Sequence, residues 1–68
     1  MIKNFHLNRT VDDSGISGTG IIAEGSVLSN GKCIVSWLSR TSSVEIWNSV
    51  EDMMKIHGHG DHTQIKFI

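Results

Sequence analysis

Proline is absent from this sequence, and cysteine occurs only once, at Cys33. A single cysteine excludes an internal disulfide and favours a reducing compartment, so we expect a cytosolic protein. Without disulfides, a chain this short buries roughly 60% of the surface that its unfolded form exposes, and it is marginally stable alone. Small domains gain stability from metals or partner subunits. We therefore expect a single domain, residues 1–68, that serves as a homo-oligomer subunit.

Long basic runs and long apolar runs are also missing. Six basic and seven acidic residues give a formal charge of −1, and the scattered cations exclude a surface that follows a nucleic-acid polymer. The apolar runs reach only two or three residues, which is too short to span a membrane. The first ten residues lack the apolar segment of a signal peptide. We expect a complete small protein whose partners include neither nucleic acid nor membrane.

The pattern that is present is the alternation of short strands. It predicts strands over residues 2–8, 20–28, 32–38, 43–48 and 63–68. Asn30–Gly31 indicates a hairpin between two of them, because both residues accept a positive φ. In the strand that follows, Cys33 shares one face with Val35 and Trp37. We therefore interpret Cys33 as a small buried hydrophobe rather than a nucleophile.

Between the fourth and fifth strands the hydrophobic period changes to that of a helix. One helical face would carry Val50, Met53, Met54 and His57. Ser49, with Asp52 three residues later, resembles a capping box, and Gly58 is a candidate for a left-handed cap. The sequence thus predicts an α+β fold, β-loop-ββ-β-α-β. It would be a small, mostly antiparallel sheet or barrel of about five strands, with one short helix before the last strand.

Residues 14–20, SGISGTG, hold three glycines, two serines and a threonine. Their spacing matches neither the dinucleotide fingerprint nor the phosphate loop that ends in lysine. Glycines still let the backbone approach a ligand, and successive N–H groups form a nest for an anion. We expect Ser17, Gly18 and Thr19 to bind a phosphate or a ribose. The alternative is a tight surface loop without a ligand.

Residues 57–62, HGHGDH, match the H-x-H-x-D-H signature of the metallo-β-lactamase fold, whose two metals generate hydroxide and clamp a phosphate. That fold is much longer than this chain, and none of the six residues after His62 is His, Asp or Glu. A single metal on His57, His59 and either Asp61 or His62 is an alternative. We expect no metal, and instead a glycine-relaxed turn from which His57 and His59 donate to a ligand.

Two tryptophans and two arginines complete the candidate site. We expect Trp37 to face the core, whereas Trp47 shares a face with Glu45 and is expected to be half exposed. Either ring could stack on a base. Arg9 and Arg40 border loops, and a guanidinium is a natural bidentate partner for a phosphate.

The order of these motifs resembles a family of small proteins from phages and actinobacteria. From Phe5 to Phe67 the chain carries FHL, SGISGTG, AEG, a hairpin ending in tryptophan, SVE, HGHG and a terminal strand. The glycine and basic residue that follow HGHG in the family are replaced here by DHTQ, which weakens a ligand role for Asp61 or His62. The chain is also similar to the anti-CBASS sponge proteins, with which phages sequester cyclic dinucleotide immune signals.

This resemblance implies a homo-oligomer, such as a tetramer, in the host cytoplasm. Pockets between its protomers would bind a cyclic dinucleotide or a related nucleotide signal without a cofactor and without catalysis. The chemistry of the side chains, rather than the resemblance, suggests the ligand-binding residues. These are Arg9, Ser17, Gly18, Thr19, Trp37, Arg40, Trp47, His57 and His59.

Three other functions stay open at this point. The first is a metal-dependent phosphodiesterase built on the histidine cluster. The second is a protein-interaction module, or an inhibitor of a host protein, with Trp47 on an apolar patch. The third is a regulatory domain that reads a nucleotide for the cell itself.

Overall fold

The computed structural model describes residues 1–11, 19–58 and 60–68. The elements follow in the order β1 (Lys3–Arg9), β2 (Gly20–Val27), β3 (Cys33–Trp37), β4 (Val44–Trp47), α1 (Val50–His57) and β5 (Thr63–Phe67). This confirms the predicted α+β fold with one short helix before the last strand. Each strand end lies within one residue of its predicted position, because the alternation of apolar residues marks the strands closely.

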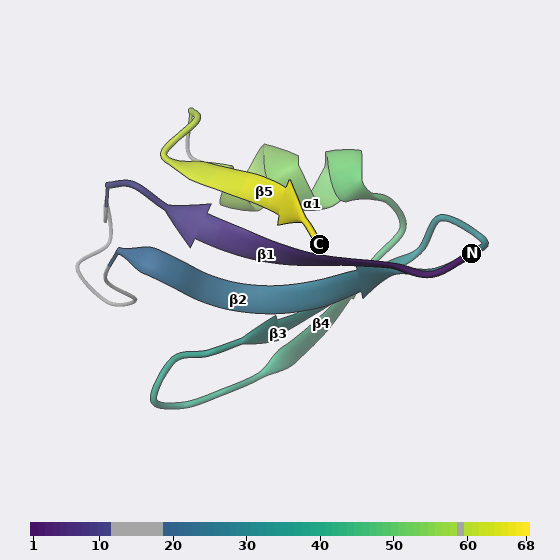
Figure 1. Ribbon diagram of the computed structural model, residues 1–68, viewed down its shortest axis with the longest axis horizontal. Helices are drawn as coiled ribbons and strands as arrows, with labels where there is room; N and C mark the ends of the chain where they lie inside the picture. The colour runs from purple at the N-terminus through teal and green to yellow at the C-terminus, as the bar shows by residue number, and fades with distance from the viewer. Residues whose placement is uncertain (12–18, 59) are drawn as a thin grey trace.

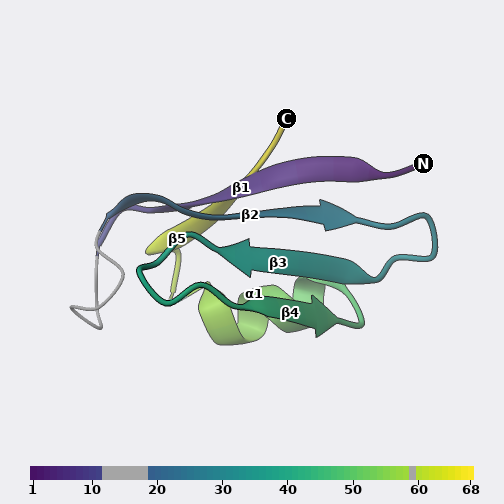
Figure 2. The same cartoon turned by 90° about the horizontal axis from the view of Figure 1, so that it is seen from below.

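The strands form one sheet in the order β4-β3-β2-β1-β5, and every neighbouring pair is antiparallel. Strands β1 to β4 make a meander, after which α1 carries the chain back across the sheet so that β5 pairs with β1 (Figure 1). The sheet is curved, and α1 lies on its concave side (Figure 2). Strands β4 and β5 are therefore the two edges of the sheet.

The core lies between the sheet and α1. Alternate residues of β1 and β3, among them Phe5, Leu7 and Val35, are fully buried on this face, and Met53 of α1 packs onto them. Each large side chain buried in this way contributes about 1.5–3 kcal/mol. Cys33 is also fully buried, which confirms its interpretation as a core residue, and burial raises the pKa of its thiol.

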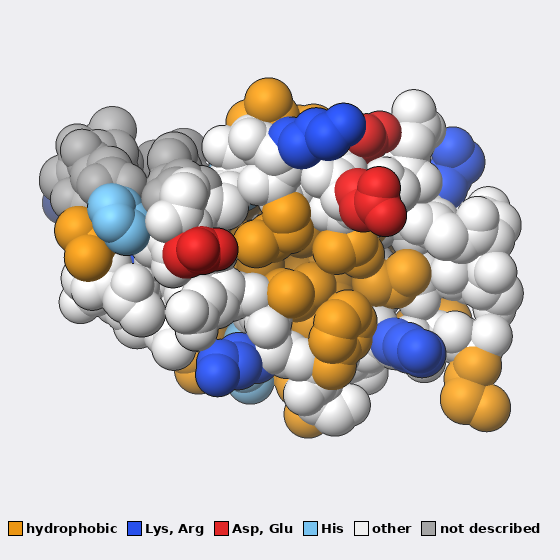
Figure 3. Space-filling model, turned by 90° about the horizontal axis from the view of Figure 1, so that it is seen from above, with side chains coloured by type: hydrophobic (Ala, Val, Ile, Leu, Met, Phe, Trp, Pro, Cys, Tyr) orange, Lys and Arg blue, Asp and Glu red, His pale blue; other side chains and the backbone are white. Residues whose placement is uncertain are grey.

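Among the described residues, no helix covers the face of the sheet opposite α1. In the space-filling view onto the side that carries α1 and β5, hydrophobic side chains gather near the middle (Figure 3). Both elements contribute partly buried hydrophobic residues at the margin of the core, namely Val50, Met54 and Ile65. In the described part of the chain, no helix has the length and apolar character needed to cross a membrane.

The predicted hairpin between β2 and β3 is present, but its turn differs from the expected one. Gly31 has a φ of +89°, whereas Asn30 is not among the residues with positive φ. The N–H of Gly31 donates to the carbonyl of Leu28 at 2.9 Å, and Lys32 N bonds Asn30 Oδ1 at 3.0 Å. Asn30 thus lies in the centre of the turn, and only Gly31, which follows it, adopts a left-handed conformation.

The helix begins as predicted and ends differently. Ser49 is the N-cap, and its hydroxyl accepts a hydrogen bond from the backbone N–H of Asp52 at 3.1 Å. The prediction of a left-handed cap at Gly58 is wrong, because this residue has right-handed angles (φ −72°, ψ −28°). A side chain at Gly58 would place its Cβ 2.5 Å from the Met54 carbonyl. Close backbone approach, and not a positive φ, therefore requires glycine here.

Candidate functional site

The predicted ligand residues that the structure describes come mainly from one end of the sheet. At this end β1, β3 and α1 finish, and β2, β4 and β5 begin (Figures 1 and 2). We call it the site end. It carries Arg9, Trp37 and His57 at the ends of their elements, Thr19 directly before β2, and Arg40 in the connection to β4. Ser17, Gly18 and His59 lie outside the described residues.

His57 is the centre of a cluster formed by β3, β4 and α1. Its ring meets the Trp37 ring edge-on, with centroids 4.7 Å apart, and the Trp47 ring at 5.4 Å. Oε1 of Glu45, a residue of β4, lies 3.0 Å from His57 Nε2. The same oxygen accepts a hydrogen bond from Trp47 Nε1 at 3.1 Å. The structure thus brings three predicted residues together with a fourth, Glu45, which was not predicted as a site residue.

This arrangement fixes the chemistry available to His57. A carboxylate only accepts hydrogen bonds, so the Nε2–H group of His57 donates a hydrogen bond to Glu45 Oε1. Among the described residues, Nδ1 has no hydrogen-bond partner. A histidine oriented by a carboxylate through one nitrogen is suited to accept a proton from a ligand through the other, or to donate one to it. The imidazole side chain is 19% exposed and that of Glu45 is 36% exposed, so a ligand can reach both.

Trp47 is partly exposed and shares a face with Glu45, as the alternation predicts. This face is directed toward α1, and Trp47 packs against the core. The residues that alternate with it, Val44 and Ile46, are more exposed, at 65% and 72%. Glu45 satisfies the Trp47 N–H and so makes this burial possible.

Arg9 is nearly buried, with 5% of its surface exposed. Its Nε donates to Thr63 Oγ1 at 3.1 Å, and the backbone N–H of Thr63 donates to the Gly58 carbonyl at 3.0 Å. These two bonds connect the end of β1, the start of β5 and the end of α1. Because it makes further interactions, Arg9 is held as part of the framework of the site end. Arg40, by contrast, is exposed.

The turn from α1 to β5 has unusual backbone geometry. Gly60 has a φ of +58°, and Asp61 follows with a φ of +75°, the one non-glycine with positive φ in the described chain. The carbonyl of His62 accepts from the N–H of Thr10 at 2.7 Å and from its hydroxyl at 3.2 Å. A left-handed aspartate is uncommon and is found at turns and functional sites. Among residues 1–11, 19–58 and 60–68, no three metal-binding side chains are grouped around a common point.

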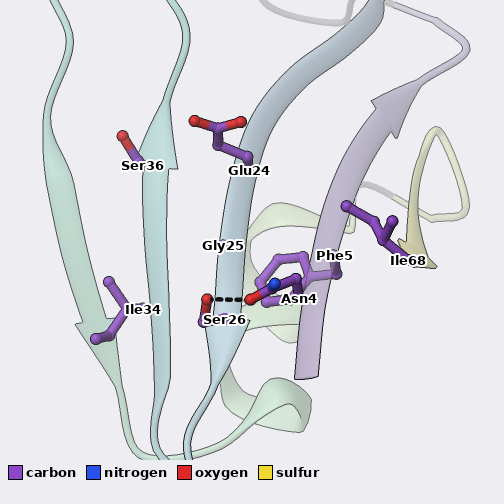
Figure 4. Close-up of a pocket in the computed structure, with 8 residues that line it drawn as sticks. All are labelled: Asn4, Phe5, Glu24, Gly25, Ser26, Ile34, Ser36 and Ile68. Atoms are coloured by element: carbon purple, nitrogen blue, oxygen red, sulfur yellow. Dashed lines mark hydrogen bonds between the residues drawn. The ribbon is translucent and has the colours of Figure 1, made fainter. Parts of the chain in front are cut away.

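A concave region lies on the face without the helix. It has a volume of about 370 Å³ and is lined mainly from β1, β2 and β3 (Figure 4). Glu24 and Ser36 lie at one end of it, while Ser26 donates to Asn4 Oδ1 at 2.8 Å near the other. Its lining includes a carboxylate and no cation. This hollow is therefore poorly suited to a phosphate, and the site end is the better candidate for an anionic ligand.

The family comparison decides the class of the protein. Residues 2–68 match the family model described as Acb5 phage protein. The chain belongs to this family. Acb names denote anti-CBASS proteins, which agrees with a phage protein of the anti-CBASS type. No curated protein matches the chain, and no solved structure matches it.

The match to the Acb5 family model covers nearly the whole chain. It therefore includes the site end as well as the face of the sheet opposite α1. It does not assign a role to any residue. The sequence offered one signal for Glu45, namely its alternation with Trp47 on a strand. Alternation alone could not assign Glu45 to the site. Its role comes from its contact with His57, which lies 12 residues away on another element.

Proposed function

We propose that this Acb5 protein counters a host immune response by binding a cyclic nucleotide signal at the site end and so removing it from solution. The family match carries the proposal, because anti-CBASS proteins act against cyclic-nucleotide signalling. The cluster around His57 supports it with an imidazole, two indole rings and access from solvent. In the primary form of the proposal the ligand is sequestered intact in the host cell.

The chemistry of such a ligand fits the groups at the site end. A cyclic dinucleotide presents two bases and two phosphates. The two partly exposed indole rings are candidates for stacking contacts worth about 1–3 kcal/mol per base. Arg40 offers a guanidinium for a phosphate, and Thr19, which is exposed directly before β2, adds a hydroxyl. The small net charge suits a compact anion better than a long polyanion.

A second candidate function is cleavage of the same signal. The specific observation that favours it is the pair of His57 Nε2 and Glu45 Oε1 at 3.0 Å, which is the geometry of an acid–base histidine held by a carboxylate. In a cyclic dinucleotide, such a histidine could take the proton from an attacking water and return it to the ribose oxygen as the P–O bond to that oxygen breaks. The chain would then be a phosphodiesterase that needs no metal for this proton transfer.

One experiment separates these possibilities. Purified protein is titrated calorimetrically with cyclic dinucleotides, incubated, heat-denatured, and the released nucleotide is identified by chromatography and mass. Intact ligand supports sequestration, and a linear product supports cleavage. Absence of binding to every cyclic nucleotide tested would overturn both and favour a protein-directed inhibitor. His57→Asn should weaken binding or abolish cleavage, while the matched change His6→Asn, on β1, should leave both unchanged.

A further inference from the structure

Strand β4 leaves part of its backbone unpaired at the edge of the sheet. The N–H of Trp37 donates to the Ser43 carbonyl at 2.9 Å, and in antiparallel pairs the bonded residues alternate. The backbone of Glu45 therefore bonds to β3, opposite Val35. The N–H and C=O groups of Val44 and Ile46 consequently point away from the sheet, ready to bond another strand.

This edge lacks three of the features that usually prevent strand addition, although it is short and carries Glu45. Lysine, proline and bulges on an edge strand oppose pairing with another chain. Strand β4, with the sequence VEIW, has none of these, whereas the other edge strand, β5, carries Lys66. Val44 and Ile46 are 65% and 72% exposed. Both the backbone and the side chains of β4 thus favour a β-strand partner.

The surface beside this edge is apolar at its centre and carries both signs of charge. A hollow of about 400 Å³ lies between β4 and the outer side of α1, and Ile46 and Ile56 line it together with Asp52 and Lys55. Ile56 is 60% exposed. A two-fold axis through such a surface would bring Lys55 of one copy toward Asp52 of the other, and the reverse. The charges are therefore complementary to those of a second copy of the same chain.

We propose that two copies of this chain pair through β4 in antiparallel orientation, which makes one continuous ten-stranded sheet from two five-stranded sheets. A register centred on Ile46 sets this residue against its counterpart. It also sets Glu45 opposite the second copy's Trp47, so that two glutamates do not face each other. The exposed Ile56 side chains would then be covered near the axis.

Dimer formation through β4 would also stabilise the candidate site. This proposal of a dimer does not depend on the proposed function. Glu45 and Trp47, which hold His57, are residues of β4 itself. A strand with partners on both sides frays less than an edge strand of four residues. The second copy would therefore keep the Glu45–His57 pair in place, and it would bring two site ends into one assembly.

The test is the mass of the purified protein in solution, measured by light scattering after gel filtration and without any nucleotide. The chain has a mass of 7.5 kDa, so pairing gives about 15 kDa, or a higher multiple if dimers associate further. Ile46→Lys should reduce that mass, because it puts two lysines against each other on the axis. The matched change Ile21→Lys, at a residue 55% exposed on β2, should leave it unchanged.

The charges provide a second, independent measurement. Lys55→Asp should weaken association at least tenfold, and adding Asp52→Lys to the same chain should restore most of it. Circular dichroism confirms that each variant is folded. A wild-type mass of one chain at every concentration would overturn the proposal, as would an Ile46→Lys protein that keeps the wild-type mass. Neither result bears on nucleotide binding, which the calorimetric experiment tests separately.

Discussion

His57 and Glu45 form a pair across two elements, with Nε2 of the histidine 3.0 Å from Oε1 of the glutamate. The same carboxylate oxygen accepts the indole N–H of Trp47. One carboxylate oxygen thereby accepts from two donors, one on α1 and one on β4. This pair is the part of the site end whose chemistry the structure defines most fully.

Removing the charge of Glu45 should weaken ligand binding, or slow ligand cleavage, without unfolding the protein. Glu45→Gln keeps an oxygen that accepts from Trp47 but loses the charge that orients His57. A hydrogen bond to a charged group contributes about 1.5–3 kcal/mol, so we expect affinity for a cyclic dinucleotide, or its rate of cleavage, to fall about tenfold or more. Calorimetry and product analysis measure this. The control Glu24→Gln changes an exposed glutamate of the helix-free face, and equal losses in both variants would contradict the assignment.

Adding a single methyl group at Gly25 should destabilise the fold. The new Cβ would lie 2.5 Å from Cζ of Phe5 and would also collide with the Ile34 carbonyl. Overpacking of this kind costs about 1–3 kcal/mol. Urea unfolding of Gly25→Ala should therefore show a lower midpoint. Ser26→Ala, one residue along the strand and on the other face, should change the stability by no more than about 0.5 kcal/mol.

The buried hydrogen bond between Arg9 and Thr63 should contribute measurably to stability. Thr63→Val keeps the shape of the side chain but removes the oxygen that accepts from Arg9 Nε. A buried donor deprived of a partner costs about 1–3 kcal/mol, which thermal unfolding can detect. Thr63→Ser retains the hydroxyl and should lose less than the valine variant. If serine and valine proved equally destabilising, packing and not the hydrogen bond would account for the loss.

The thiol of Cys33 should be unreactive in the folded protein. It is fully buried, and burial raises its pKa, while only the thiolate attacks alkylating reagents. We expect iodoacetamide to modify Cys33 only after denaturation, as mass spectrometry would show. Rapid modification of the native protein would mean that β3 opens readily.

The same pKa shift predicts the direction of a pH effect on stability. Because the folded protein holds the thiol proton more tightly than the unfolded chain, the unfolded chain ionises first as the pH rises. The contribution of this group is complete below the ordinary pKa of a free thiol and is lost as the pH rises toward the folded value. Urea midpoints should therefore decline in alkaline buffers. Cys33→Ala should decline less steeply, and an identical slope would contradict this prediction.

Local signals in the sequence account for the elements that were predicted correctly. The helix was found because Ser49 and Asp52 cap it and because Met53 has neighbours at helical spacing. These signals act over three or four residues and need no tertiary contact. The hairpin was likewise marked by its glycine, and only the position of that glycine in the turn was misjudged.

The amino-acid sequence by itself determined the number, type and order of the elements, because alternation and capping are properties of neighbouring residues. It also determined that the chain carries few cations and one cysteine. Only the tertiary structure decided which face of β4 is buried, since a strand with Trp47 on one side and Ile46 on the other has two apolar faces. The position of α1 made that choice. By placing His57 above β4, it gave Glu45 its partner and left Ile46 exposed at an open edge.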